Sequence, residues 1–147
     1  IDSCGTGGGS SNWWQQGGFS YHEGESADAR MTDAASRRGV KLTSRSRPLC
    51  PEDFDRFEYI VCMDASNRTS VMRAADGWEG EGRAAKGELR AKAEERTRMM
   101  HTFCSKYNVG EVPDPYYGGA QGFETVLDLL DDAGEGLLAH IDSERAQ

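Results

Sequence analysis

A short apolar run, Tyr59 to Met63, is the feature that most constrains the fold of this chain. A run with no charged side chain on either alternating face is typical of a strand buried on both sides. Helical patterns flank it, a short one from Pro51 to about Phe57 and a longer one from Ser66 to Ala75. Strands that alternate with helices predict a parallel sheet with helices on both faces, and therefore the α/β class.

Three further elements follow from the same reading. Ser26 to about Arg38 is typical of a helix capped by the serine hydroxyl, and Met99–Cys104 is the last candidate strand. A long C-terminal helix is indicated by apolar residues at helical spacing, with Gly134 and Gly136 weakening it near its middle. These apolar residues are Phe123, Val126, Leu127, Leu130, Leu137, Leu138 and Ile141.

The length, net charge and cysteine spacing of the chain exclude several classes of function. A length of 147 residues predicts one domain spanning 1–147. A net charge of −8, from 17 basic and 25 acidic residues, argues against nucleic acid or an anionic membrane as partner, and no apolar run is long enough to span a bilayer. The four cysteines and three histidines lack metal-ligand spacing, so we expect no metal and no cofactor.

A segment near residue 114 points to acid chemistry. Pro113 and Pro115 flank Asp114 and restrict it to extended geometry, because proline fixes its own φ and limits the residue before it. Tyr116 and Tyr117 follow directly and can wall a pocket. A surface Asp-Pro turn is the alternative for this dipeptide alone.

Together with other motifs, this segment resembles the low-molecular-weight protein-tyrosine phosphatases, most closely the plant and cyanobacterial kind. The motifs stand in the family's order and cover nearly the whole chain except about residues 76–98. They are Asp2–Thr6, Tyr21–Gly24, Asp28–Met31, Ser44–Pro48, Pro51–Phe54, Tyr59–Asp64, Asp114–Gly119 and Gly122–Leu130.

The resemblance implies a three-layer α/β fold with a four-stranded parallel sheet in the complete family. It also implies a C-x5-R-[ST] loop after the first strand, where a cysteine thiolate attacks phosphorus. This chain begins at what resembles the end of the second strand. We therefore expect it to lack the family's first strand, loop and helix, and to be inactive alone.

The family mechanism is hydrolysis of phosphotyrosine or aryl phosphates through a cysteinyl-phosphate. By resemblance, Asp114 is the general acid and then the general base, and Tyr21, Tyr116 and Tyr117 line the slot for the phosphotyrosine ring. Ser3 and Ser44 match positions that support the catalytic loop, although many members carry His at the latter. Trp13 and Trp14 lie in an insertion and could extend the rim of the slot.

Two internal C-x5-R matches are interpreted as decoys. Cys50 to Arg56 contains three acids and a proline, which favours the first turn of a helix over a phosphate cradle. Cys62 to Arg68 follows an apolar run, but it has no glycine to turn amides inward, and Asp64 would lie among the phosphate oxygens. We interpret it as the end of the family's third strand.

Alternatives remain open. A pseudophosphatase would keep the aromatic slot and bind phosphotyrosine without turnover, and arsenate reductases share this fold but need extra cysteines as redox shuttles. We expect a phosphotyrosine protein or a small aryl phosphate as partner. The expected location is the cytoplasm, with the plastid as an alternative.

Overall fold

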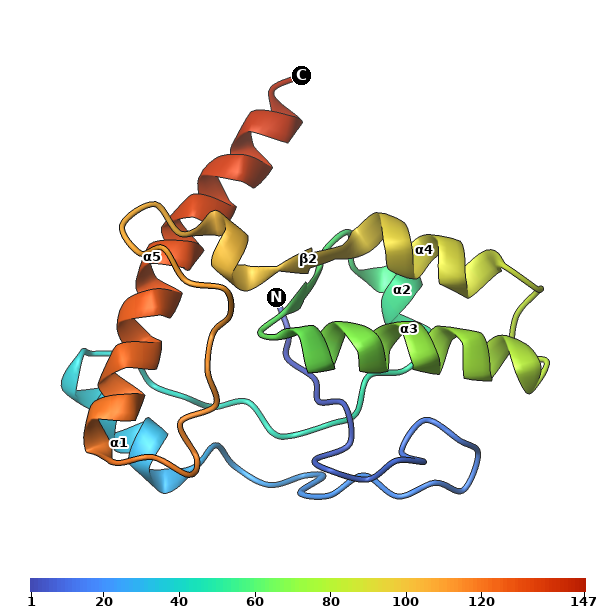
Figure 1. Cartoon of the computed structure of the whole chain (residues 1–147), viewed down its shortest axis with the longest axis horizontal. Coiled ribbons are helices and arrows are strands. Elements are labelled where there is room, and N and C mark those ends of the chain that lie inside the picture. The colour runs from blue at the N-terminus through green and yellow to red at the C-terminus, as the bar shows by residue number, and fades with distance from the viewer.

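The computed structural model of the protein describes all of residues 1–147. The chain forms five α-helices, one 3-10 helix and two short strands, arranged as Figure 1 shows. In chain order they are α1 (Ala29–Arg37), α2 (Asp53–Arg56), β1 (Ile60–Cys62), α3 (Ala65–Gly80), α4 (Glu88–Arg96), β2 (Thr97–Met99), η1 (Met100–Phe103) and α5 (Ala120–Arg145).

The two strands pair in parallel, with Ile60 opposite Thr97 and Cys62 opposite Met99. A further parallel pairing joins Gly5 to Pro48, where the Gly5 N–H donates to the Arg47 carbonyl at 2.8 Å. The α/β class with parallel strands is therefore confirmed. The strand count differs from the four of the complete family fold, because residues 44–49 run extended beside Gly5 and not in the β1–β2 ladder.

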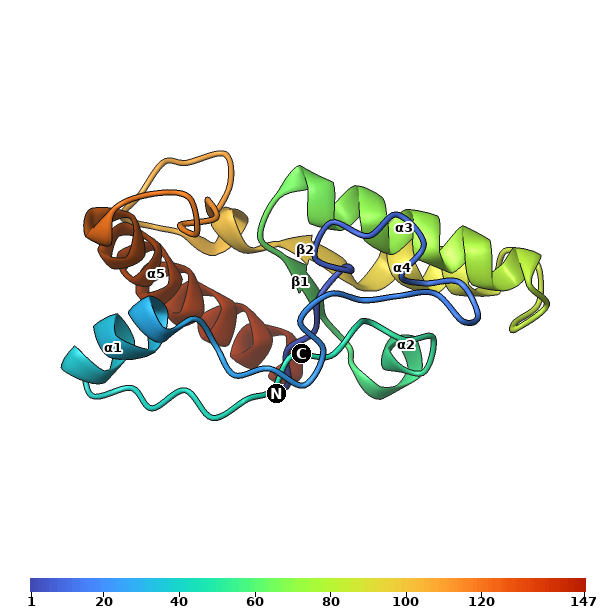
Figure 2. The same cartoon turned by 90° about the horizontal axis from the view of Figure 1, so that it is seen from below.

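Helices cover the strands from two sides (Figure 2). On one side α1 packs across α5, and on the other α3 and α4 lie side by side with α2 below them. Residues 1–27 contain no helix or strand and pass along α3. No helix combines the length and apolar character that a bilayer crossing requires.

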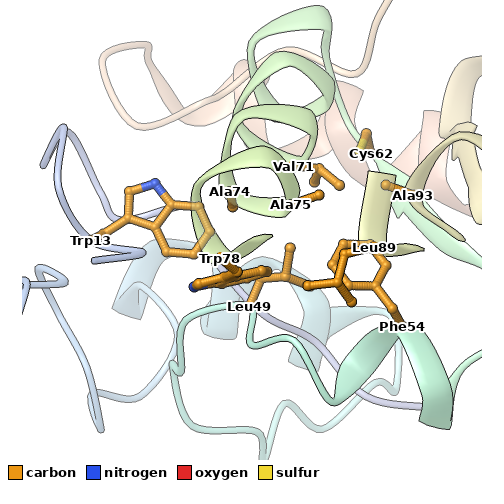
Figure 3. Close-up of a cluster of buried hydrophobic side chains, with 10 residues drawn as sticks. All are labelled: Trp13, Leu49, Phe54, Cys62, Val71, Ala74, Ala75, Trp78, Leu89 and Ala93. Carbon is orange, nitrogen blue, oxygen red and sulfur yellow. The ribbon is translucent and has the colours of Figure 1, made fainter. Parts of the chain in front are cut away.

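The main hydrophobic core lies between α2, α3 and α4 and is drawn in Figure 3. Trp78 is 1% exposed, packs edge-on against Phe54 and Trp13, and donates its indole N–H to the Trp14 carbonyl at 2.7 Å. The expectation that Trp13 and Trp14 form the rim of a site is therefore wrong. A buried indole and the close approach of the Trp14 ring to Gly77 fasten the N-terminal segment to α3.

Several helix and strand boundaries differ from expectation, and α3 in particular continues to Gly80, five residues beyond the expected end at Ala75. Asp28, not Ser26, caps α1, because its carboxylate accepts the Arg30 N–H at 2.8 Å. The expected last strand, Met99–Cys104, shares only Met99 with the observed strand Thr97–Met99, because Met100–Phe103 forms the 3-10 helix η1. Met100 is buried against α5, so packing onto that helix turns the chain away from the sheet.

Asp132 joins α5 to the turn that follows η1. Its carboxylate, in a residue only 2% exposed, accepts the backbone N–H groups of residues 105–107 at 2.9 to 3.2 Å and the Ser105 hydroxyl at 3.0 Å. Burial acts to raise the pKa of Asp132, but these donors outweigh it and hold the pKa below its usual value. The folded structure therefore stabilises the ionised form of the Asp132 side chain.

The two mid-helix glycines do not break α5, which runs unbroken from Ala120 to Arg145. Gly136 has a packing role, since a β-carbon there would lie 2.0 Å from the Phe103 carbonyl oxygen. Gly134 faces open space, with nothing within 4 Å of such an atom. Gly136 thus sets how closely α5 approaches η1.

These two positions predict opposite effects of the same substitution. Gly136→Ala should destabilise the protein by about 1–3 kcal/mol, because the new methyl group forces α5 away from Phe103. Gly134→Ala, the matched control, should stabilise it by about 0.5–1 kcal/mol through helix propensity alone. Urea unfolding monitored by circular dichroism measures both. Equal effects of the two substitutions would contradict the packing role of Gly136.

Candidate active site

Asp114 is exposed on the segment between η1 and α5. Its Oδ1 accepts the Tyr116 N–H at 2.9 Å across Pro115, which closes a local turn. Oδ2 carries no hydrogen bond within the protein and faces solvent. The carboxylate is thus fixed by one oxygen and available through the other, which is the arrangement that proton transfer to a bound molecule requires.

Two tertiary contacts hold this segment in place. On one side, the N–H of the buried Val112 donates to the Met63 carbonyl at 2.9 Å, just beyond the end of β1. On the other side, Arg30 of α1 donates to the Tyr116 carbonyl at 3.1 Å. The Asp114 segment is therefore attached at one side to the carboxyl end of β1 and at the other side to the start of α1.

Arg30 is itself held on three sides. Its guanidinium donates to the Asp28 carboxylate at 3.0 and 3.1 Å and lies 5.3 Å from the Tyr116 ring centre and 4.8 Å from that of Phe123. The hydrogen bond from Arg30 lowers the pKa of Asp28 to about 2. Sequence reasoning included this arginine in a motif but missed its role, since only the fold brings α1 to the start of α5.

The three predicted slot tyrosines fall into two places. Tyr116 and Tyr117 pack edge-on at 5.0 Å, and Tyr117 is 92% exposed. Tyr21 lies on the N-terminal segment, half exposed, where its ring meets Phe19 edge-on at 4.8 Å. Tyr116 and Tyr117 therefore lie beside Asp114 on the same segment. Tyr21 packs instead against Phe19 on the N-terminal segment.

Ser3 and Ser44, the two residues assigned by resemblance to loop support, lie on the wall of one cavity. This cavity, of about 250 Å³, lies between residues 3–5, 25–27 and 44–47. The Gly24 N–H donates to the Ser46 carbonyl at 2.7 Å and closes one wall. Ala27 in this lining immediately precedes Asp28, so the cavity and the acid segment flank the same end of α1.

Cys50 lies just before α2, which begins at Asp53 and not at the expected Pro51. Its N–H and thiol both approach the Asp53 carboxylate, at 3.0 and 3.4 Å, and Asp53 is 1% exposed and paired with Arg47 at 2.8 Å. Burial and the neighbouring carboxylates of Glu52 and Asp53 raise the pKa of the Cys50 thiol to about 11. It is therefore protonated at neutral pH and a poor nucleophile.

Cys62 also lacks the properties of a phosphate-binding cysteine. It is 4% exposed at the end of β1, and burial, with smaller contributions from Cys4 and Asp64, raises its pKa to about 11. Asp64 caps α3 by accepting the Asn67 N–H at 2.7 Å. The residues after Cys62 therefore cap and begin α3, and they do not form a phosphate-binding loop. No group of His, Cys, Asp and Glu side chains is arranged to hold a metal ion.

Comparison with known proteins settles the family. The family model for low molecular weight phosphotyrosine protein phosphatase matches residues 14–147. The chain belongs to this family. A Synechocystis protein, slr0328, named as a candidate low molecular weight protein-tyrosine-phosphatase, is 36% identical over 128 residues, which cover 87% of this chain and 73% of that protein. The low molecular weight protein-tyrosine-phosphatase of Streptomyces coelicolor is 32% identical over 143 residues, covering 96% and 72% respectively.

Solved structures agree with this membership. A crystal structure of a protein tyrosine phosphatase from Entamoeba histolytica, with Hepes in its active site, superposes with a TM-score of 0.70 at 36% identity. The match covers 86% of this chain and 72% of that one. Membership places the chain among the phosphoric monoester hydrolases, and it confirms the family that the sequence motifs indicate.

The role of Arg30 predicts how acid and mutation affect the Asp114 segment. The pKa of Asp28 lies below its usual 3.8, at about 2, so the Asp28–Arg30 pair is fully formed above about pH 4 and is lost as the pH falls through about 2. Asp28→Asn keeps a capping side chain for α1 but removes the charge. It should therefore loosen residues 114–118 at neutral pH.

Backbone ¹⁵N relaxation measures this effect, and we expect lower order parameters for residues 114–118 in the variant than in the wild type. Asp33→Asn is the control, since it removes the ion pair with Arg37, farther along α1, whose guanidinium also binds Glu124 of α5. Unchanged relaxation in Asp28→Asn would refute the anchoring role.

Proposed function

We propose that the protein acts on phosphotyrosine by two-step phosphoryl transfer, with Asp114 as the proton donor and then the proton acceptor. The observation that supports this best is the environment of Asp114. Two prolines, the Val112–Met63 hydrogen bond and Arg30 fix the backbone on both sides, while Oδ2 stays open to solvent. A surface turn with no function would not need fastening at both ends.

Tyr116 and Tyr117 would contact the aromatic ring of the substrate. Their edge-on pair presents a broad, rigid aromatic surface directly after the acid, and aromatic side chains favour offset or edge contacts with another ring. Tyr21 would join them only if the N-terminal segment moved towards α5. Ser3 and Ser44 would support a phosphate-binding loop from the cavity that they share.

We further propose that none of Cys50, Cys62 and Cys104 is the attacking nucleophile. Burial raises the pKa of all three thiols, and thiolates, not thiols, attack phosphorus. The nucleophile would come from the family's catalytic C-x5-R-[ST] loop, because the one internal match, Cys62 to Thr69, forms the end of β1 and the start of α3. Phosphotyrosine binding without turnover is therefore the second candidate function for the chain as it stands.

The thiol environments predict that the 147-residue chain hydrolyses no aryl phosphate. A chromogenic aryl phosphate assay from about pH 5 to 6 measures this directly. The Cys62→Ser variant should behave like the wild type, because Cys62 contributes no thiolate. Turnover that disappears in Cys62→Ser would make the loop from Cys62 to Arg68 the true catalytic loop.

Asp114 can be tested in a chain joined to the strand, C-x5-R-[ST] loop and helix of a family member. Asp114→Asn should lower kcat roughly 10²- to 10⁴-fold for phosphotyrosine, whose leaving group needs a proton. A substrate with a good leaving group should lose less. Asp64→Asn is the matched control, because Asp64 caps α3 and Asn can cap equally well. A larger, leaving-group-dependent loss in Asp64→Asn would reassign the acid.

A further inference from the structure

A groove of about 810 Å³ lies on the surface outside the Asp114 segment. It runs along α3 and is bounded by α4, by the end of β2 and by η1, which lie together in Figure 1. Gly110 forms one end of it, two residues before the Val112 that is fastened to Met63. The groove therefore leads directly into the segment that carries Asp114.

Its charges are unusual for an acidic protein. Three arginines line it, Arg68, Arg73 and Arg90, against two carboxylates, Asp76 and Glu94. Arg90 binds both carboxylates, at 2.7 and 2.8 Å, so these three side chains together carry one net negative charge.

Arg68 and Arg73 are left without a partner. Both side chains are exposed, and neither forms a hydrogen bond or ion pair within the protein. His101 adds a ring nitrogen, Nδ1, that is buried at the groove without a hydrogen-bond partner. In a chain of net charge −8, two free guanidinium groups and an unsatisfied imidazole in one hollow favour an anionic ligand.

We propose that this groove binds an acidic segment of the phosphotyrosine substrate, an inference that rests on the proposed function. Arg68 and Arg73 are five residues apart on α3, a rise of about 7.5 Å along the helix and a turn of about 140° around it. The two long side chains start from different sides of the helix, but both line the same groove. Two acidic residues at alternate positions of an extended peptide, about 7 Å apart on one face, can each pair with one guanidinium group there.

A binding assay separates this inference from catalysis. The probe is a fluorescent peptide without phosphate, carrying Glu at two alternate positions, and its comparison peptide carries Gln at both. Fluorescence anisotropy with the 147-residue chain at low salt should show tighter binding of the Glu peptide by roughly three- to tenfold, as two exposed ion pairs allow. Added salt should reduce the difference. Failure of the proposed function would leave these results unchanged, because no phosphate or turnover is involved.

Variants identify the groove as the site. Arg68→Gln with Arg73→Gln should abolish the preference for Glu, whereas Arg68→Lys with Arg73→Lys should retain most of it. Lys86→Gln with Arg145→Gln removes the same charge from two exposed, unpaired positions outside the groove and should retain the preference. Equal binding of the two peptides, or equal loss in the groove pair and the control pair, would overturn the proposal.

Discussion

The buried Asp132 carboxylate is the interaction on which the placement of the candidate site depends. Three successive backbone N–H groups, those of residues 105–107, converge on it from the turn after η1. Without this carboxylate the three N–H groups would lose their acceptor, and the turn would lose its attachment to α5. The same turn leads to the Asp114 segment. Asp132 of α5 therefore fixes the position at which that segment starts.

Local chemistry made much of this architecture predictable. The apolar run at Tyr59 to Met63 gave β1 to within one residue at each end, and the heptad-like spacing from Phe123 to Ile141 gave the long α5. Both elements follow from the spacing of apolar side chains, which is a local property of the sequence. The end of the last strand was wrong because Met100 is buried against a helix that begins twenty residues later.

In the candidate site, too, the local features were predictable from the sequence and the long-range contacts were not. Pro113 and Pro115 restrict Asp114 from within its own segment, so the sequence alone identifies the constraint. Arg30 acts on that segment from 86 residues away, and nothing near it in the sequence indicates which carbonyl it binds. Trp13 was misjudged for a related reason. A tryptophan among glycines is typical of an exposed loop, and only contact with Trp78 shows that it is buried.

The tryptophan contacts also bear on what counts as the folding unit. The match to the family model begins at residue 14, yet Trp13, immediately before that boundary, is part of the main core. An expression fragment trimmed to the matched region would therefore leave the Trp78 ring without one of its two aromatic neighbours and open the core to water. In this chain the boundary of the family-model match lies inside the packed core, and a domain boundary drawn there would divide it.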